Sequence, residues 1–392
     1  MSTKSRATMS RYPTSEHGCP LPVPKKVGIA LSGGGSHGAF TAGIIHTAFA
    51  SYLKEGKLPR VSIIAGTSTG SLVAALLTQL YGRFRKGDEP ERALADLQKV
   101  YTKTTQSEVG ILPSGTICKV YNLLTKGGLM DIAPLKLLVD KYYEQRYFDA
   151  ALEKADPVVY VADVIDMPTG FGKQFYSNAD HGRDIMCEAI FASCAQPVVM
   201  TPATVSGHWS TDGGVREVIP FREPMNNGCT HILAVALNEP HIDPGDAACM
   251  KDPKDVFGRI DRGLSVMNDE VARDDERLAR MTAFLNRGKD VLLYNDVTQE
   301  LLDRAFPATG PLPEGENAGS PGNKDPYDNR AYNHSVLREL LFFRLEQRDD
   351  MPDSNVFDEK NLTTMFRWGQ ELADKNAGAI RKFLFEAGEF RV

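Results

Sequence analysis

Residues 61–77 read VSIIAGTSTGSLVAALL, and this stretch determines the fold that we predict for the chain. Val61 to Ala65 is a short apolar run typical of a buried strand, and the apolar residues of 72–77 recur at helical spacing. Between them lies a G-x-S-x-G sequence, in which a sharp turn can hold the Ser68 hydroxyl clear of a sheet. Gly66 and Gly70 suit such a turn because the backbones of the strand and the helix approach each other too closely for a Cβ. Taken alone, the segment also fits an ordinary turn with Ser68 as a helix cap.

The preceding residues repeat this order. Lys26 to Leu31 indicates another buried strand, Ser32 to Gly38 a glycine-rich loop, and the apolar spacing of residues 40–48 a helix. Alternating strands and helices favour parallel strands with helices on both faces. We therefore predict a three-layer α/β/α fold around a mostly parallel central sheet. Further strands are expected at Val158 to Ala162 and His231 to Leu237.

The chain divides into four expected segments. These are a polar amino-terminal tail at 1–24, a catalytic domain at 25–300, a flexible linker at 301–330 and a helical carboxy-terminal extension at 331–392. Proline and glycine in 307–330 indicate a mobile loop that proteases should cut first. Within the domain, one apolar helix face is expected from Leu264, Met267, Val271, Leu278 and Leu285. Within the extension, helices are expected at Leu337 to Leu345 and Leu362 to Leu384.

Composition excludes several classes of protein. The 392 residues are 42% hydrophobic and carry a formal net charge of −6, without a dense Lys/Arg block, so we expect no nucleic-acid partner. No apolar run approaches the ~20 residues of a spanning helix, and the amino-terminal stretch lacks the apolar centre of a secretory signal. The sequence indicates a cytoplasmic protein that is at most peripheral to a membrane. The six cysteines lack the paired spacing of disulfides or metal ligands, so they indicate reduced thiols. They are Cys19, Cys118, Cys187, Cys194, Cys229 and Cys249.

The glycine-rich loop indicates an anion site. Backbone N–H groups of Gly33, Gly34 and Gly35, next to a helix start, are suited to a phosphate or to the oxyanion of an acyl-transfer intermediate. The loop ends at Gly38 and matches G-x-G-x-x-G, so a dinucleotide site is an alternative. That site requires an acidic residue at the end of the next strand, where this chain has Ala65-Gly66-Thr67. A phosphate- or nucleotide-binding module without catalysis remains the non-enzyme alternative.

A third segment supplies a base for the serine. Asp212 is followed by Gly213 and Gly214, and a serine needs a neighbouring base to become nucleophilic at neutral pH. An aspartate before two glycines can approach a neighbouring backbone closely. The Asp-Gly-Gly turn is common by itself, and its value here lies in its occurrence together with the other two segments.

These three segments, in this order, resemble the signature of patatin-like phospholipases. Residues 192–197 (ASCAQP) also resemble the family's A-S-x-A-x-P segment, and residues 128–135 resemble its lead into a helix. The resemblance spans about residues 25–240. It implies a Ser68–Asp212 dyad, an oxyanion hole of glycine N–H groups and an acyl-enzyme intermediate. It also implies phospholipid or lysophospholipid substrates reached by reversible contact with a membrane surface, and no metal or other cofactor.

Two positions depart from the family pattern. His37 stands where many members have Arg or Lys, and Val218 stands where many have Asn. An α/β-hydrolase esterase with a Ser-Asp-His triad is the enzyme alternative, because His231, His241 and His334 follow Asp212 in the chain. Only one predicted strand precedes the strand that leads to Ser68, whereas α/β-hydrolases usually have several, so we favour the dyad.

Overall fold

The computed structural model describes residues 24–114, 116–153, 156–237, 256–294, 335–346, 351, 354–385 and 389–391. Residues 1–23 and the predicted linker at 301–330 lie outside the described residues, as does the cleavage site expected at 307–330. The boundary proposed near residue 300 therefore stays a prediction.

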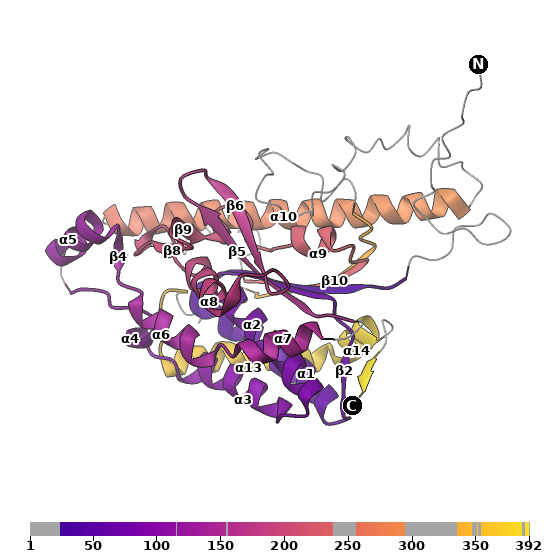
Figure 1. Ribbon diagram of the computed structural model, residues 1–392. Helices are drawn as coiled ribbons and strands as arrows, with labels where there is room; N and C mark the ends of the chain where they lie inside the picture. Colours follow the sequence, from indigo (N-terminus) through magenta and orange to yellow (C-terminus); the bar gives the residue numbers. More distant parts are fainter. Residues whose placement is uncertain are drawn as a thin grey trace, which may run out of the picture.

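Among the described residues, eight strands form a central sheet (Figure 1). Its order is β11-β10-β1-β3-β5-β9-β8, with β6 also paired to β5, and the first five of these strands are parallel. The antiparallel strands gather at the other edge. The sheet strands are β1 (Val27–Leu31), β3 (Ile63–Thr67), β5 (Val159–Asp166), β6 (Phe171–Tyr176), β8 (Ala203–Val205), β9 (His208–Asp212), β10 (His231–Ala236) and β11 (Glu339–Arg344). The mostly parallel sheet that we predicted is confirmed.

Helices cover both faces of the sheet, and Figure 1 shows the long α10 on one face and α1, α2, α3 and α13 on the other. The helices are α1 (Gly38–Leu53), α2 (Thr69–Lys86), α3 (Pro90–Lys103), α4 (Gln106–Val109), α5 (Thr116–Lys126), α6 (Ala133–Tyr142), α7 (Gln145–Leu152), α8 (Gly182–Ser193), α9 (Arg222–Asn226), α10 (Val256–Tyr294), α13 (Glu359–Lys375) and α14 (Ala377–Phe385). Short 3₁₀ turns η1 (Gly35–His37) and η2 (Gly213–Val215) and small strands β2 (Lys57–Pro59), β4 (Gly128–Met130), β7 (Val198–Met200) and β12 (Glu389–Arg391) complete the described elements.

The five parallel strands contribute to two apolar cores, because successive side chains point to opposite faces. Ile64 of β3 packs in the core shared with α1, α2 and α8, whereas Ile63 and Ala65 pack in the core shared with α9 and α10. The three predicted layers are thus present. This sandwich fixes where β3 ends and α2 begins.

The expected helix at Leu337 to Leu345 is wrong. Within this range, Glu339–Arg344 form β11, which pairs in parallel with β10, because an apolar run of this length fits a buried strand as well as a helix. The helical region expected at Leu362 to Leu384 exists as α13 and α14. Residues assigned to a helical extension therefore also complete the central sheet.

The apolar face expected for α10 is wrong at three positions, whereas its Val271 packs against the core. Met267, Leu278 and Leu285 of the predicted face are 55%, 38% and 40% exposed, whereas Ala272 and Ala279 are buried against the sheet. Small side chains let this helix approach the strands closely. Hydropathy alone favoured the larger residues and so included three that face solvent.

Helix α13 crosses α1 at very close range. A Cβ added to Gly43 would lie 2.0 Å from the Phe366 carbonyl oxygen, and one added to Gly369 would lie 2.0 Å from the Phe40 carbonyl oxygen. Each helix therefore has a glycine where the other helix's backbone passes. The crossing buries Phe40 and Phe366 in the same core as α2.

Candidate active site

Ser68 occupies the sharp turn between β3 and α2, as the sequence predicts. Its backbone has φ 54° and ψ −128°, a conformation that costs a non-glycine residue free energy and is often found at nucleophile elbows. Gly66 and Gly70 allow the turn, since a Cβ on Gly66 would lie 2.3 Å from the Gly70 carbonyl oxygen and one on Gly70 would lie 2.2 Å from the Leu31 carbonyl oxygen. Ser68 itself is half-buried, so its hydroxyl is reachable.

Asp212 ends β9 and meets Ser68. The Ser68 hydroxyl hydrogen-bonds the Asp212 carboxylate, and the Gly214 N–H donates to Asp212 Oδ1 at 2.8 Å. Burial raises the pKa of Asp212 to about 6, although both hydrogen bonds act in the opposite direction. Gly213 packs against β5, where a Cβ would lie 2.6 Å from Asp163 Oδ2. The structure thus brings together a serine and a carboxylate that is largely ionised at neutral pH.

The glycine-rich loop lies against this pair. A Cβ on Gly33 would be 3.0 Å from Ser68 Cβ and 3.8 Å from Ser68 Oγ, and one on Gly38 would be 2.1 Å from Thr69 Oγ1. The loop leads into η1 and α1, so the positive end of a helix dipole is close to it. The Gly33 N–H, however, donates to the Val218 carbonyl at 3.2 Å.

Residues from the carboxy-terminal part of the chain also reach this loop. The Ser354 carbonyl accepts a hydrogen bond from the Ser36 N–H at 2.8 Å, and a Cβ on Gly35 would lie 2.3 Å from the same oxygen. The segment before α13 therefore packs directly on the glycine loop.

Two further residues position the site, and the sequence did not reveal their roles. Ser193, at the end of α8, accepts a hydrogen bond from the Ser68 N–H on its Oγ at 3.0 Å. Asp275 of α10 accepts hydrogen bonds on Oδ2 from the N–H groups of Val218 and Ile219, at 2.9 and 3.0 Å. Ser193 lies in the ASCAQP segment that resembled the family, which was a signal for it. Asp275 lies in a charged helix sequence that carries no such signal.

The departure at Val218 now has a structural explanation. The loop after the Asp-Gly-Gly turn is held by Asp275, and the Thr67 hydroxyl donates to the Glu217 carbonyl at 3.1 Å. The Val218 carbonyl in turn accepts a hydrogen bond from the Gly33 N–H. Backbone groups at residue 218 make these contacts, so no particular side chain is needed there.

Three described histidines, His37, His208 and His231, can be placed relative to Ser68 and Asp212. His231 pairs with Val27 at the amino end of β1, whereas Ser68 follows the carboxyl end of β3, so these two residues lie at opposite ends of the sheet. His37 is buried in η1, and His208 is exposed and faces Asp166. His241 and His334 lie outside the described residues.

Within the described part of the chain, no group of three or more His, Cys, Asp or Glu residues is arranged to hold a metal ion. Cys187, Cys194 and Cys229 are buried free thiols, and Cys118 is an exposed one. Burial raises the pKa of Cys187 to about 12, so this thiol stays protonated.

Comparisons with known proteins point to one family. No curated protein matches the chain. Among solved structures, VipD from Legionella pneumophila aligns at 12% sequence identity with a TM-score of 0.32, over 93% of this chain and 70% of that one. The family profile described as patatin-like phospholipase matches residues 29–225, just over half of the chain. The chain therefore belongs to the patatin-like phospholipase family.

Proposed function

We propose that the chain hydrolyses acyl ester bonds of phospholipids or lysophospholipids with Ser68 as nucleophile and Asp212 as general base. The observation that carries this proposal is the hydrogen bond between the Ser68 hydroxyl, on its strained turn, and the buried Asp212 carboxylate. The family's general activity, lipid acyl hydrolysis, agrees with it.

In the proposed mechanism, Ser68 Oγ attacks the ester carbonyl carbon while Asp212 accepts the hydroxyl proton. The N–H groups of Gly34 and Gly35 stabilise the resulting oxyanion. The Gly33 N–H is not assigned this role, because it donates a hydrogen bond to the Val218 carbonyl. As the tetrahedral intermediate collapses, the leaving alcohol takes the proton from Asp212. Water, deprotonated by Asp212, then attacks the acyl carbon; as the Ser68 Oγ–acyl bond breaks, Asp212 returns this proton to Ser68 Oγ and the fatty acid leaves. Asp212 can act as a base at neutral pH because its pKa lies near 6.

The chain reaches its substrate by peripheral contact with lipid surfaces in this proposal. Among the described residues, no helix is both long and apolar enough to cross a bilayer. Apolar side chains are nevertheless exposed on α5 and the loop before it, and we name this surface the α5 patch: Ile111, Leu112, Val120, Tyr121 and Leu124. Insertion of such side chains into the interfacial region supports reversible binding without a dense basic surface.

A serine-reactive fluorophosphonate probe tests the nucleophile. We expect covalent labelling of the wild-type chain that is lost in Ser68→Ala, together with hydrolysis of one or more members of a phospholipid and lysophospholipid panel. Ser62→Ala is a matched control, because Ser62 lies just before β3 and away from the elbow. Absence of labelling in a folded wild-type chain would favour the phosphate-binding alternative.

A further inference from the structure

The side of α10 that points away from the sheet carries apolar side chains at two places. They are between 40% and 69% exposed. Two lie in the amino-terminal half of the helix and three in the carboxy-terminal half: Val266 and Met267, then Met281, Phe284 and Leu285. Exposed apolar groups that cluster in this way mark surfaces that bind a partner.

Two opposite charges lie between these apolar groups. Asp274 and Arg277 are exposed and about one helical turn apart. Neither forms an ion pair within the part of the chain that the structure describes. A neighbouring pair on the same helix does, since Arg280 Nε lies 2.7 Å from Glu276 Oε1. Asp274 and Arg277 are therefore available to charges on another molecule.

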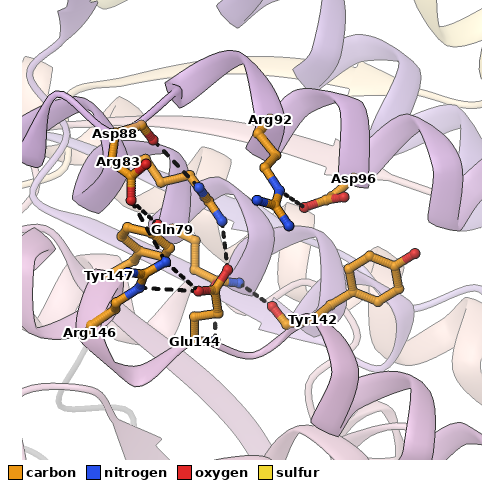
Figure 2. Close-up of polar contacts among 9 residues, drawn as sticks. All are labelled: Gln79, Arg83, Asp88, Arg92, Asp96, Tyr142, Glu144, Arg146 and Tyr147. Atoms are coloured by element: carbon orange, nitrogen blue, oxygen red, sulfur yellow. Dashed lines mark hydrogen bonds and ion pairs between the residues drawn. The ribbon is translucent and has the colours of Figure 1, made fainter.

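Elsewhere the chain pairs such charges within itself, and Figure 2 shows the network at the carboxyl end of α2. Arg83 Nη2 and Arg146 Nη2 lie 2.6 and 3.0 Å from the two carboxylate oxygens of Glu144. This network joins α2 to the start of α7. The described residues offer Asp274 and Arg277 no comparable ion-pair partner.

The exposed side of α10 is complementary to itself when the helix is reversed. Reversal about the point midway between Asp274 and Arg277 places each of these residues against the other. The same reversal places Met267 against Phe284, so that one apolar group meets the other. A contact between two copies related by a two-fold axis requires this kind of self-complementarity.

We propose that this side of α10 binds the same side of α10 in a second copy of the chain, with the two helices antiparallel. The apolar groups then leave water at both ends of the contact, which favours association. The pair of Asp274 and Arg277 forms twice and fixes direction and register. Parallel helices in register would instead place like charges together. The sheet packs on the opposite side of each helix, so the two copies extend away from each other.

The size of the contact sets the expected affinity. The contact runs from Val266 to Leu285, about 30 Å along the helix. Such a contact is small for an obligate dimer, so we expect a reversible dimer with a measurable dissociation constant. The inference does not depend on the proposed function, because it uses no residue of the dyad or of the glycine loop.

An exchange of the two charges tests the proposal. Sedimentation velocity at a series of concentrations measures the dissociation constant of the full chain. Arg277→Asp brings carboxylates together at both pairs, and Asp274→Arg brings guanidinium groups together, so each is expected to raise the dissociation constant at least about tenfold. The double variant Asp274→Arg/Arg277→Asp restores opposite charges and is expected to return it to within about threefold of the wild type. Arg367→Asp, exposed on α13, is the matched control and should leave it unchanged.

Circular dichroism establishes that each variant folds. Met281→Glu, within one apolar group, is expected to weaken the dimer at least about tenfold without changing the charge pair. A wild-type chain that is monomeric at every concentration overturns the proposal, as does a dimer that neither single charge variant weakens.

Two further results would also overturn it. Weakening by both single charge variants without recovery in the double variant contradicts the antiparallel pairing of Asp274 with Arg277. A monomeric wild type whose binding to phosphatidylcholine vesicles is lost in Met281→Glu assigns this side of α10 to a lipid surface rather than to a second copy.

Discussion

The Asp275 carboxylate of α10 accepts a hydrogen bond from the Val218 N–H at 2.9 Å, and this contact joins the long helix to the loop behind the active site. Asp275→Ala leaves two buried N–H groups unpaired, so we expect a loss of about 2 to 4 kcal/mol in the free energy of unfolding. We also expect kcat/KM to fall about tenfold or more, because the loop that supports Gly33 shifts. Urea unfolding and ester hydrolysis measure the two effects.

Two matched variants make this prediction specific. Asp275→Asn keeps a side-chain oxygen that can accept hydrogen bonds from both N–H groups. It should retain most of the activity. Asp274→Ala changes the exposed neighbour and should behave like the wild type. An Asp275→Ala protein with unchanged stability and turnover would contradict the positioning role.

The pH dependence of the rate should follow Asp212. The base is active only when ionised, so kcat/KM on an uncharged ester should fall as pH drops below about 6, the pKa of Asp212. Asp212→Asn should lose at least about a thousandfold in rate while keeping its fold. Replacing His231, His241 or His334 singly by Ala should change the rate only a few-fold. A folded histidine variant with a thousandfold loss would establish the triad instead.

The ionised Asp212 carboxylate should lower the free energy of unfolding at neutral pH. The folded-state pKa of Asp212, about 6, exceeds the ordinary value of 3.8, so the protonated form is favoured by folding. This contribution is fully present below about pH 4 and is lost as pH rises through 6. The asparagine side chain of Asp212→Asn is neutral at every pH, so the variant keeps this stabilising contribution at high pH. Its free energy of unfolding near pH 8 should therefore exceed that of the wild type by about 3 kcal/mol. Urea unfolding should show this gain disappearing near pH 4; an equal difference at both pH values would argue against the raised pKa.

Membrane contact should depend on the α5 patch. Tyr121→Asp combined with Leu124→Asp places charges on the two most exposed patch residues, and we expect vesicle binding to fall at least about tenfold. Flotation with phosphatidylcholine vesicles measures it. Phe284→Asp is the control, because Phe284 is 69% exposed on α10. Binding of the wild type that requires anionic lipid altogether would exclude the apolar mode.

The sequence predicted the parts of the fold that depend on neighbouring residues. The strand and helix around Ser68 follow from apolar spacing and from glycines that a tight turn requires, and β3 and α2 lie there. The strand β11 was missed because only its pairing with β10, about a hundred residues away, distinguishes it from a helix. Similarly, small residues of α10 face the sheet. Which side of this helix is buried depends on the space between the layers, which the local sequence does not show.

The same limit applies to the site. Ser68 and Asp212 were identified because three motifs occur together, and the structure places their side chains in contact. Asp275 was missed because its partners are two backbone N–H groups, which no residue pattern marks. The Gly33 N–H was expected to face the oxyanion, yet its bond to Val218 depends on a segment far along the chain.

The glycine-to-backbone crossing of α1 and α13 has a consequence for synthesis of the protein. A ribosome that has completed β3 and α2 has not yet made α13, so the face of α1 that α13 covers stays exposed until residue 375 has been added. The strained Ser68 turn persists only when surrounding packing holds it. We therefore expect chains that end before α13 to leave this apolar face of α1 exposed to solvent.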